Sequence, residues 1–313
     1  MESNPEWNDF SNKHAQPEDL SRREFLSLLT ALGAVGLSAC APPGPQSHSL
    51  SAPPTAALTA LPKTEVPNDF EGYSIFHQTM VEMPWLEIKK AAQDGAIVLL
   101  PIGIIEEHGP HMGLGADIYQ AYFWSKLTRR ALNVRGIQAL IAPPYYWGIN
   151  VSTASFPGSF TVRSDTMRAV LYDIHESLNR WGFKYVFSLN QHSDSIHYSV
   201  LSDALQKVRI ELGIGAFLAT PDVPVFPGSS RLSQATDIHA GAYETAKMAL
   251  EFPMDVNIDL ARTLPPSNSF QPLGYYGDPA SFDLLNANEI RKWVEDCGAA
   301  TAEWIQDFLN KKK

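Results

Sequence analysis

Short apolar runs alternate with longer amphipathic stretches along the chain after residue 68. Four runs have the length and composition of strands: 96–100, 137–141, 185–189 and 216–219. They lack polar alternation, which is typical of parallel strands covered on both faces. Four stretches have helical length and spacing: 84–93, 117–132, 165–180 and 195–211. The pattern predicts one α/β domain with a largely parallel central sheet over residues 68–313.

The first 39 residues have the features of an export signal. Arg22 and Arg23 precede an uncharged apolar run, 25–39, which is shorter than the roughly 20 residues that a membrane-spanning helix needs. The arginine pair predicts twin-arginine export. Leu37-Ser-Ala-Cys40 resembles the bacterial lipobox, in which cleavage before the cysteine allows lipid attachment. The alternative is an uncleaved amphipathic or buried helix with an incidental arginine pair.

A proline-rich segment follows this signal. Residues 41–67 contain seven prolines, with Ala, Ser and Thr filling most of the rest, so residues 40–67 are predicted to be a semi-extended tether. We expect an exported protein on the periplasmic or cell-surface face. It would meet the membrane only through a lipid on Cys40.

Composition narrows the function classes. The 313 residues include 24 basic and 34 acidic side chains, a formal net charge of -10, which argues against a nucleic-acid surface. The 44% apolar content is enough for a folded body. Two cysteines, Cys40 and Cys297, form no disulfide framework and no CxxC metal motif. Any metal must therefore be held by histidines and carboxylates.

Such residues follow two of the predicted strands. Glu106, His108 and Asp117 come after strand 96–100, while His192 and Asp194 come after strand 185–189. The carboxyl ends of parallel strands meet at one edge of a sheet, where binding sites gather. Alternation in an extended loop sends Glu106 and His108 to one side, and likewise His192 and Asp194.

Three carboxylates and two imidazoles suit a pair of bridged divalent ions, about 3.5–4 Å apart. Zn or Mn would fit these ligands best, with Fe as a third option. The alternative is a set of solvated loop charges and hydrogen-bonded core histidines.

A third segment places His239 just before a probable helix and Glu244 within it. A helix N-terminus lowers the pKa of a nearby imidazole and orients anions. Each also has a structural reading, the histidine as a hydrogen-bonding residue and the glutamate as a first-turn carboxylate.

Four ordered motifs resemble the creatininase (creatinine amidohydrolase) family. They are Leu100-Pro-Ile-Gly-Ile-Ile-Glu-Glu-His-Gly-Pro-His with Asp117, Phe156-Pro-Gly-Ser, Leu189-Asn-Gln-His192, and His239-Ala-Gly-x-x-Glu-Thr. The resemblance implies a three-layer α/β sandwich that binds two metal ions and assembles as a homohexamer. Carried over, Glu106 and His192 would hold one metal, His108 and Asp194 the other, and Asp117 would bridge them.

The sequence also departs from the family pattern. Where many relatives read Asn-Gly-His-Gly-Gly-Asn, this chain has Asn190-Gln-His-Ser-Asp-Ser195, and creatininase itself has a glutamate where Asp194 stands. Residues 221–238 contain no tryptophan, although creatininase closes over its substrate with tryptophans there. This second departure weighs against creatinine as the substrate.

The resemblance implies a metal-dependent hydrolase of a small molecule. We expect an amidohydrolase acting on a small cyclic amide or related C–N bond. Expelling an amine needs a proton donor, and His239 is our candidate general acid, with Glu244 orienting it. Two alternatives stay open: hydrolysis of a non-amide such as a lactone or cyclic keto-polyol, and a non-catalytic, metal-binding surface lipoprotein.

Overall fold

The computed structural model describes residues 74–224 and 237–312. All of these residues fall within one compact unit, Val66–Lys313. The predicted signal, the lipidated Cys40 and the proline-rich tether lie outside the described residues, and they stay predictions.

Within the described residues, four strands form one parallel sheet. They are β1 (Ile97–Ile102), β2 (Ala139–Ile141), β3 (Tyr185–Asn190) and β4 (Gly215–Leu218), in the order β2-β1-β3-β4. Leu99 of β1 lies opposite Ile141 of β2 and Phe187 of β3. Every residue of β1 is buried, as expected for a central parallel strand. The four strands predicted from the apolar runs are confirmed.

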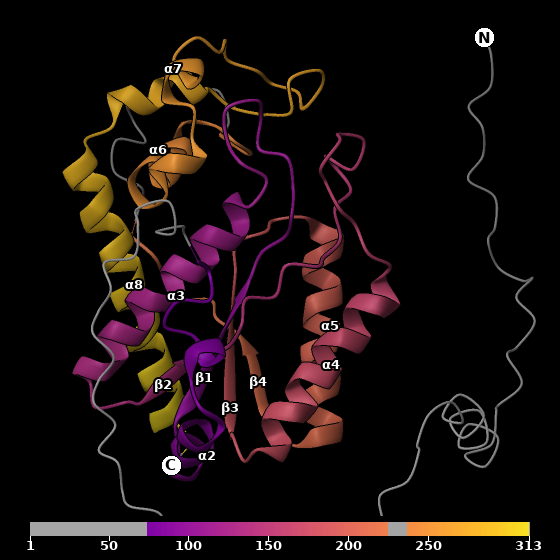
Figure 1. Cartoon of the computed structure of the whole chain (residues 1–313), viewed down its shortest axis with the longest axis vertical. Helices are drawn as coiled ribbons and strands as arrows, with labels where there is room; N and C mark the ends of the chain where they lie inside the picture. The colour runs from indigo at the N-terminus through magenta and orange to yellow at the C-terminus, as the bar shows by residue number, and fades with distance from the viewer. Residues whose placement is uncertain (1–73, 225–236, 313) are drawn as a thin grey trace, which may run out of the picture. The chain divides into compact units, whose positions relative to one another are not determined.

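Alternate residues of β1 contact different helical layers. Val98, Leu100 and Ile102 pack in a core with α2 (Trp85–Gln93), α4 (Ser164–Arg180) and α5 (Ser195–Leu212). Ile97 and Leu99 pack in a second core with α3 (Ala116–Val134) and α8 (Ala287–Asn310). Figure 1 shows α3 and α8 on one side of the sheet and α4 and α5 on the other. The predicted three-layer α/β sandwich is therefore confirmed.

The long C-terminal helix α8 covers α3. Its buried positions Ile290, Trp293, Val294 and Cys297 follow the three-and-four spacing of an amphipathic helix. A Cβ at Gly298 would lie 2.6 Å from the Cβ of Leu127, so glycine allows the two helices to approach closely.

Shorter elements complete the described chain. They are α6 (Ala242–Glu251), α7 (Ile258–Ala261) and three 3-10 helices, Met80–Glu82, Pro253–Asp255 and Pro279–Leu284. No helix among residues 74–224 and 237–312 is long and apolar enough to cross a membrane. The N-termini of α3 and α6 come close to the loops that leave β1 and β3, and this brings together the candidate functional residues.

Candidate metal centre

Four segments that are distant in the sequence supply the centre. The loop after β1 carries Glu106 and His108, the first turn of α3 carries Asp117, the end of β3 leads to His192, and the first turn of α6 carries Glu244. The first four of these side chains are buried, and Glu244 is partly buried. The polar residues that follow the strands therefore do converge.

Asp117 lies between the two ring systems. Its Oδ1 is 3.4 Å from Nε2 of His108, and its Oδ2 is 3.1 Å from Nδ1 of His192. Oε2 of Glu106 lies 3.0 Å from Nδ1 of His192, while Oε2 of Glu244 lies 3.9 Å from Nε2 of His108. Among the described residues, three groups have ligand atoms within 4.8 Å of one another, and one of them is Glu106, His108 and His239. The other two are Glu106, Asp117 and His192, and His108, Asp117 and Glu244. They share Asp117.

The second nitrogen of each imidazole bonds to the backbone. Nδ1 of His108 donates to the carbonyl of Glu106 over 3.1 Å, and Nε2 of His192 donates to the carbonyl of Ile149 over 3.0 Å. Because a carbonyl oxygen only accepts, these bonds fix each ring so that its other nitrogen faces the carboxylates. Metal-ligating histidines are held in this way.

The charges in the cluster call for cations. In the described part of the chain, no Lys or Arg forms an ion pair with Glu106, Asp117 or Glu244. Burial opposes protonation of the two histidines, but the bond to Asp117 and the other carboxylates outweigh it. They raise the pKa of His108 and of His192 to about 10. Burial likewise opposes ionisation of Asp117, yet the two histidines lower its pKa.

Two buried ligand atoms, Nε2 of His108 and Oδ2 of Asp117, have only these ion-pair contacts and no hydrogen bond of good geometry in the described structure. An unpartnered buried polar atom is costly, by roughly 1–3 kcal/mol, unless a ligand satisfies it. Divalent cations would satisfy these atoms and would replace the protons on the rings. The donor set of carboxylates and imidazoles therefore fits Zn, Mn or Fe.

Thr153 supports Glu106 from the loop after β2. Its hydroxyl lies 2.5 Å from Oε1 of Glu106, which leaves Oε2 directed at His192. Burial acts to raise the pKa of Glu106, but the bond from His192 lowers it overall. Sequence reasoning missed Thr153, because a single threonine in a loop carries no motif.

His239 lies beside the cluster, with its ring centroid 4.5 Å from that of His108. Its Nε2 donates to the carbonyl of Glu107 over 2.8 Å and is 3.6 Å from the carboxylate of the same residue. Nδ1 therefore holds the free lone pair of the neutral ring. Paired backbone hydrogen bonds with Tyr276 hold His239 just before α6.

Asp194 is placed differently from our expectation. It is the N-cap of α5, and its carboxylate accepts hydrogen bonds from the backbone N–H groups of Ile196, His197 and Val151. It belongs to none of the groups whose ligand atoms converge. The geometry therefore does not support Asp194 as a ligand of the second metal, and Glu244 lies in that place.

Glu244 also differs from its expected role as the partner of His239. Its Oε2 accepts the backbone N–H of Ala240 over 2.6 Å and faces His108. The carboxylate that approaches His239 is instead Glu107, which sequence reasoning missed. Gly274, at a φ of +76°, packs so closely on Glu107 that a Cβ there would overlap the carboxylate.

A cavity of about 100 Å³ opens over the cluster. Its lining is mostly polar, with two apolar residues, and consists of Glu106, Asp117, Ser152, Gln191, His192, Ser193, Asp194, Ile238, His239, Glu244 and Phe270. The cavity gives a small molecule access to both groups around Asp117.

The sequence matches the family described as "Creatininase: Creatinine amidohydrolase" over residues 81–305. A creatinine amidohydrolase of Pseudomonas putida is 26% identical over 220 residues, covering 64% of this chain and 81% of that protein. A mycofactocin precursor peptide peptidase of Mycobacterium ulcerans is 26% identical over 226 residues, covering 66% and 85%.

Solved structures share the fold. A crystal structure of creatinine amidohydrolase (creatininase) has a TM-score of 0.58 and 21% identity, and covers 74% of this chain and 97% of that one. A structure named "Creatininase Mn" has a TM-score of 0.57 and 20% identity, with coverage of 74% and 98%.

Proposed function

Because the chain belongs to the creatininase family of hydrolases, we propose that it is a two-metal hydrolase with Asp117 as the bridging ligand. Glu106 and His192 would complete one metal site, and His108 and Glu244 the other. The observation that carries this proposal is the position of Asp117, whose two carboxylate oxygens face different histidines.

Two divalent ions held there would acidify a water molecule and polarise the bond under attack. The chain's own residues would do the rest. Thr153 and the backbone carbonyls hold the ligands in place, so that the positions of both ions are set before substrate arrives. Preorganised groups stabilise a transition state without reorganising during the reaction.

Expelling an amine requires a proton donor, and His239 suits this role. Its Nε2 is held by the carbonyl of Glu107, so Nδ1 is the nitrogen that would carry the transferred proton. His239 lines the cavity over the cluster, where a leaving group would lie. We assign it as the general acid.

The substrate class that we propose is a small amide or related C–N bond. The absence of tryptophan from residues 221–238 weighs against creatinine itself. Assays of metal-loaded protein against cyclic amides, short peptides, lactones and oxidised cyclitols would test this. Turnover of lactones alone would indicate a non-amide hydrolase. Absence of both turnover and bound metal would contradict the proposed two-metal hydrolase.

The variant His239→Ala is expected to keep both metal ions and its fold, and to lose about 10²–10⁴ in kcat. Elemental analysis and circular dichroism check the first part, and steady-state kinetics the second. The loss should shrink for a substrate with a good leaving group, because such a group needs less protonation in the transition state.

His77→Ala is a suitable control, since this histidine is exposed and its side chain pairs only with Glu82 among the described residues. An equal loss for poor and good leaving groups in His239→Ala would rule out the acid role. A loss of metal would make His239 a ligand, which its place in a group with Glu106 and His108 allows.

We also propose that the protein is exported by the twin-arginine route and lipid-anchored through Cys40. Metabolic labelling with palmitate in a lipoprotein-competent bacterium should label the wild type and not Cys40→Ser, while Cys297→Ser should still be labelled. Replacing Arg22 and Arg23 by lysine should stop export. An unlabelled wild-type protein would contradict the anchor.

A further inference from the structure

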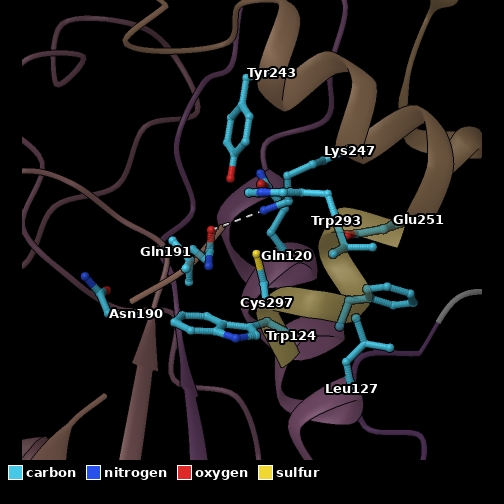
Figure 2. A pocket seen from close by; sticks show the side chains of 13 residues that line it. Gln120, Trp124, Leu127, Asn190, Gln191, Tyr243, Lys247, Glu251, Trp293 and Cys297 are labelled. Atoms are coloured by element: carbon cyan, nitrogen blue, oxygen red, sulfur yellow. Dashed lines mark hydrogen bonds between the residues drawn. The ribbon is translucent and has the colours of Figure 1, made fainter. Parts of the chain in front are cut away.

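A second cavity, of about 170 Å³, lies next to the metal centre. It is enclosed by α3, α6, α8 and the end of β3, as Figure 2 shows. Gln120 and Lys247 line it, and each stands three residues after a metal-ligand candidate, Asp117 and Glu244 respectively. Residues three apart share a helix face, so the cavity begins about one turn, roughly 5 Å, from the ligands.

Lys247 brings a positive charge into this cavity. The residue is only 5% exposed, and its ammonium donates a hydrogen bond to Oε1 of Gln191 over 3.4 Å and also interacts with the hydroxyl of Tyr243. The rings of Tyr243 and Trp293 lie 5.2 and 5.8 Å from Nζ. Among the residues that the structure describes, no carboxylate lies within 4.0 Å of this ammonium. Burial acts to lower the pKa of Lys247, but Tyr243 and the carboxylates of Glu251 and Glu244 outweigh it and raise the pKa, so the cavity holds a charged ammonium.

Other polar atoms in the cavity lack hydrogen-bond partners among the described residues. Gln120 is 1% exposed, and neither atom of its amide has a hydrogen-bond partner in the described structure. Oε2 of Glu251 is likewise buried and unpartnered. Burial raises the pKa of Glu251 to about 8, although Lys247 acts to lower it.

The remaining walls are apolar and largely aromatic. Phe123, Trp124 and Leu127 come from α3, and Trp293 and Val294 from α8. Figure 2 shows Tyr243, Lys247 and Gln191 directed toward the same part of the cavity, with Trp124 and Cys297 on another side of it. A ligand that fits has an apolar body and an anionic end with hydrogen-bond acceptors.

We propose that this cavity is a substrate subsite for a carboxylate on a small apolar or aromatic body, with Lys247 as its ion-pair partner and Gln120 as a second donor. The assignment of the ligand as substrate rests on the proposed hydrolase function. It names the substrate class as amides with a free carboxylate a few bonds from the scissile bond, such as N-acylated amino acids. Glu244 and Lys247 lie about one helical turn apart on α6. The carboxylate of such a substrate would therefore lie only a few bonds from the bond that is hydrolysed.

Binding of 3-phenylpropionate to metal-free protein tests the subsite, with 3-phenylpropionamide as the neutral probe. Metal-free protein is used so that the carboxylate of the probe cannot bind to the metal ions instead of the subsite. The result is then also independent of catalysis. Calorimetry should show the carboxylate binding at least about tenfold more tightly than the amide, as expected for a hydrogen-bonded ion pair. Lys247→Met, of similar length and without charge, should abolish this preference.

Lys126→Met is the matched control, because Lys126 also lies 5.2 Å from a tyrosine ring but does not line this cavity. It should bind like the wild type. If Lys247→Met does not fold, Gln120→Leu should still weaken carboxylate binding several-fold. Equal affinity for the two probes, absence of binding, or unchanged binding in Lys247→Met would each overturn the subsite.

The metal-loaded enzyme tests the substrate role separately. N-acetylphenylalanine should be hydrolysed with a kcat/KM at least about tenfold above that of N-acetylphenylalaninamide at its acetyl–nitrogen bond, and Lys247→Met should remove the difference. Failure of the two-metal proposal would abolish both activities and leave probe binding intact. Equal hydrolysis of the two compounds would overturn the substrate role alone.

Discussion

Replacing Asp117 by alanine is expected to remove both metal ions and to lower turnover by at least about 10³-fold. Asp117 faces His108 with one oxygen and His192 with the other, so its loss takes a ligand from each metal site. It also leaves two cations repelling each other at close range. Metal assistance contributes several kcal/mol to a transition state, and each 1.36 kcal/mol is a factor of ten in rate.

The measurement is elemental analysis after dialysis, followed by kinetics on the same sample. Asp165→Ala is the matched control, because Asp165 also stands in the first turn of a helix, α4, while its side chain is 96% exposed. This control should keep two ions per chain. Two ions surviving in Asp117→Ala would refute the bridging role.

Single substitutions of Glu244 and Asp194 should have opposite effects on metal content. Glu244→Ala is expected to lose one ion and at least about 10²-fold in turnover, because the His108 site would keep only two side-chain ligands. Asp194→Asn is expected to keep both ions, since asparagine caps a helix nearly as well as aspartate. Its activity should stay within a few-fold of the wild type.

Asp194→Ala separates the cap from the metal centre. It should lower the free energy of unfolding by about 1 kcal/mol, the usual effect of losing an N-cap, with metal content unchanged. Chemical denaturation of the metal-free protein measures this. Loss of an ion in Asp194→Asn, or retention of both ions in Glu244→Ala, would contradict this assignment. Either result would favour Asp194 as the ligand of the second metal, as the sequence suggested.

The central sheet could be predicted because its signal is local. β1 and β3 are short apolar runs, and the polar residues that follow them lie at one edge for any parallel pairing. Glu106, His108, Asp117 and His192 were predicted in this way, and the structure brings the four side chains together. This prediction required only that β1 and β3 be neighbours in the sheet.

The structure places Asp194 apart from the converging ligand candidates, although alternation in an extended loop predicted it beside His192. In the structure α5 begins at Ser195, so Asp194 turns toward the free N–H groups of the helix instead of alternating with His192. Glu244 and Glu107 were harder to place. Glu244 reaches His108 across more than a hundred residues of sequence, and only the position of α6 brings it there. Spacing along the chain contains no such information.

Anomalous diffraction from crystals soaked with manganese or zinc tests the two-metal account most directly. The account predicts two peaks, about 3.5–4 Å apart, on either side of the Asp117 carboxylate, with Glu244 and not Asp194 next to the ion at His108. A single peak, or a pair that does not contact Asp117, would contradict it.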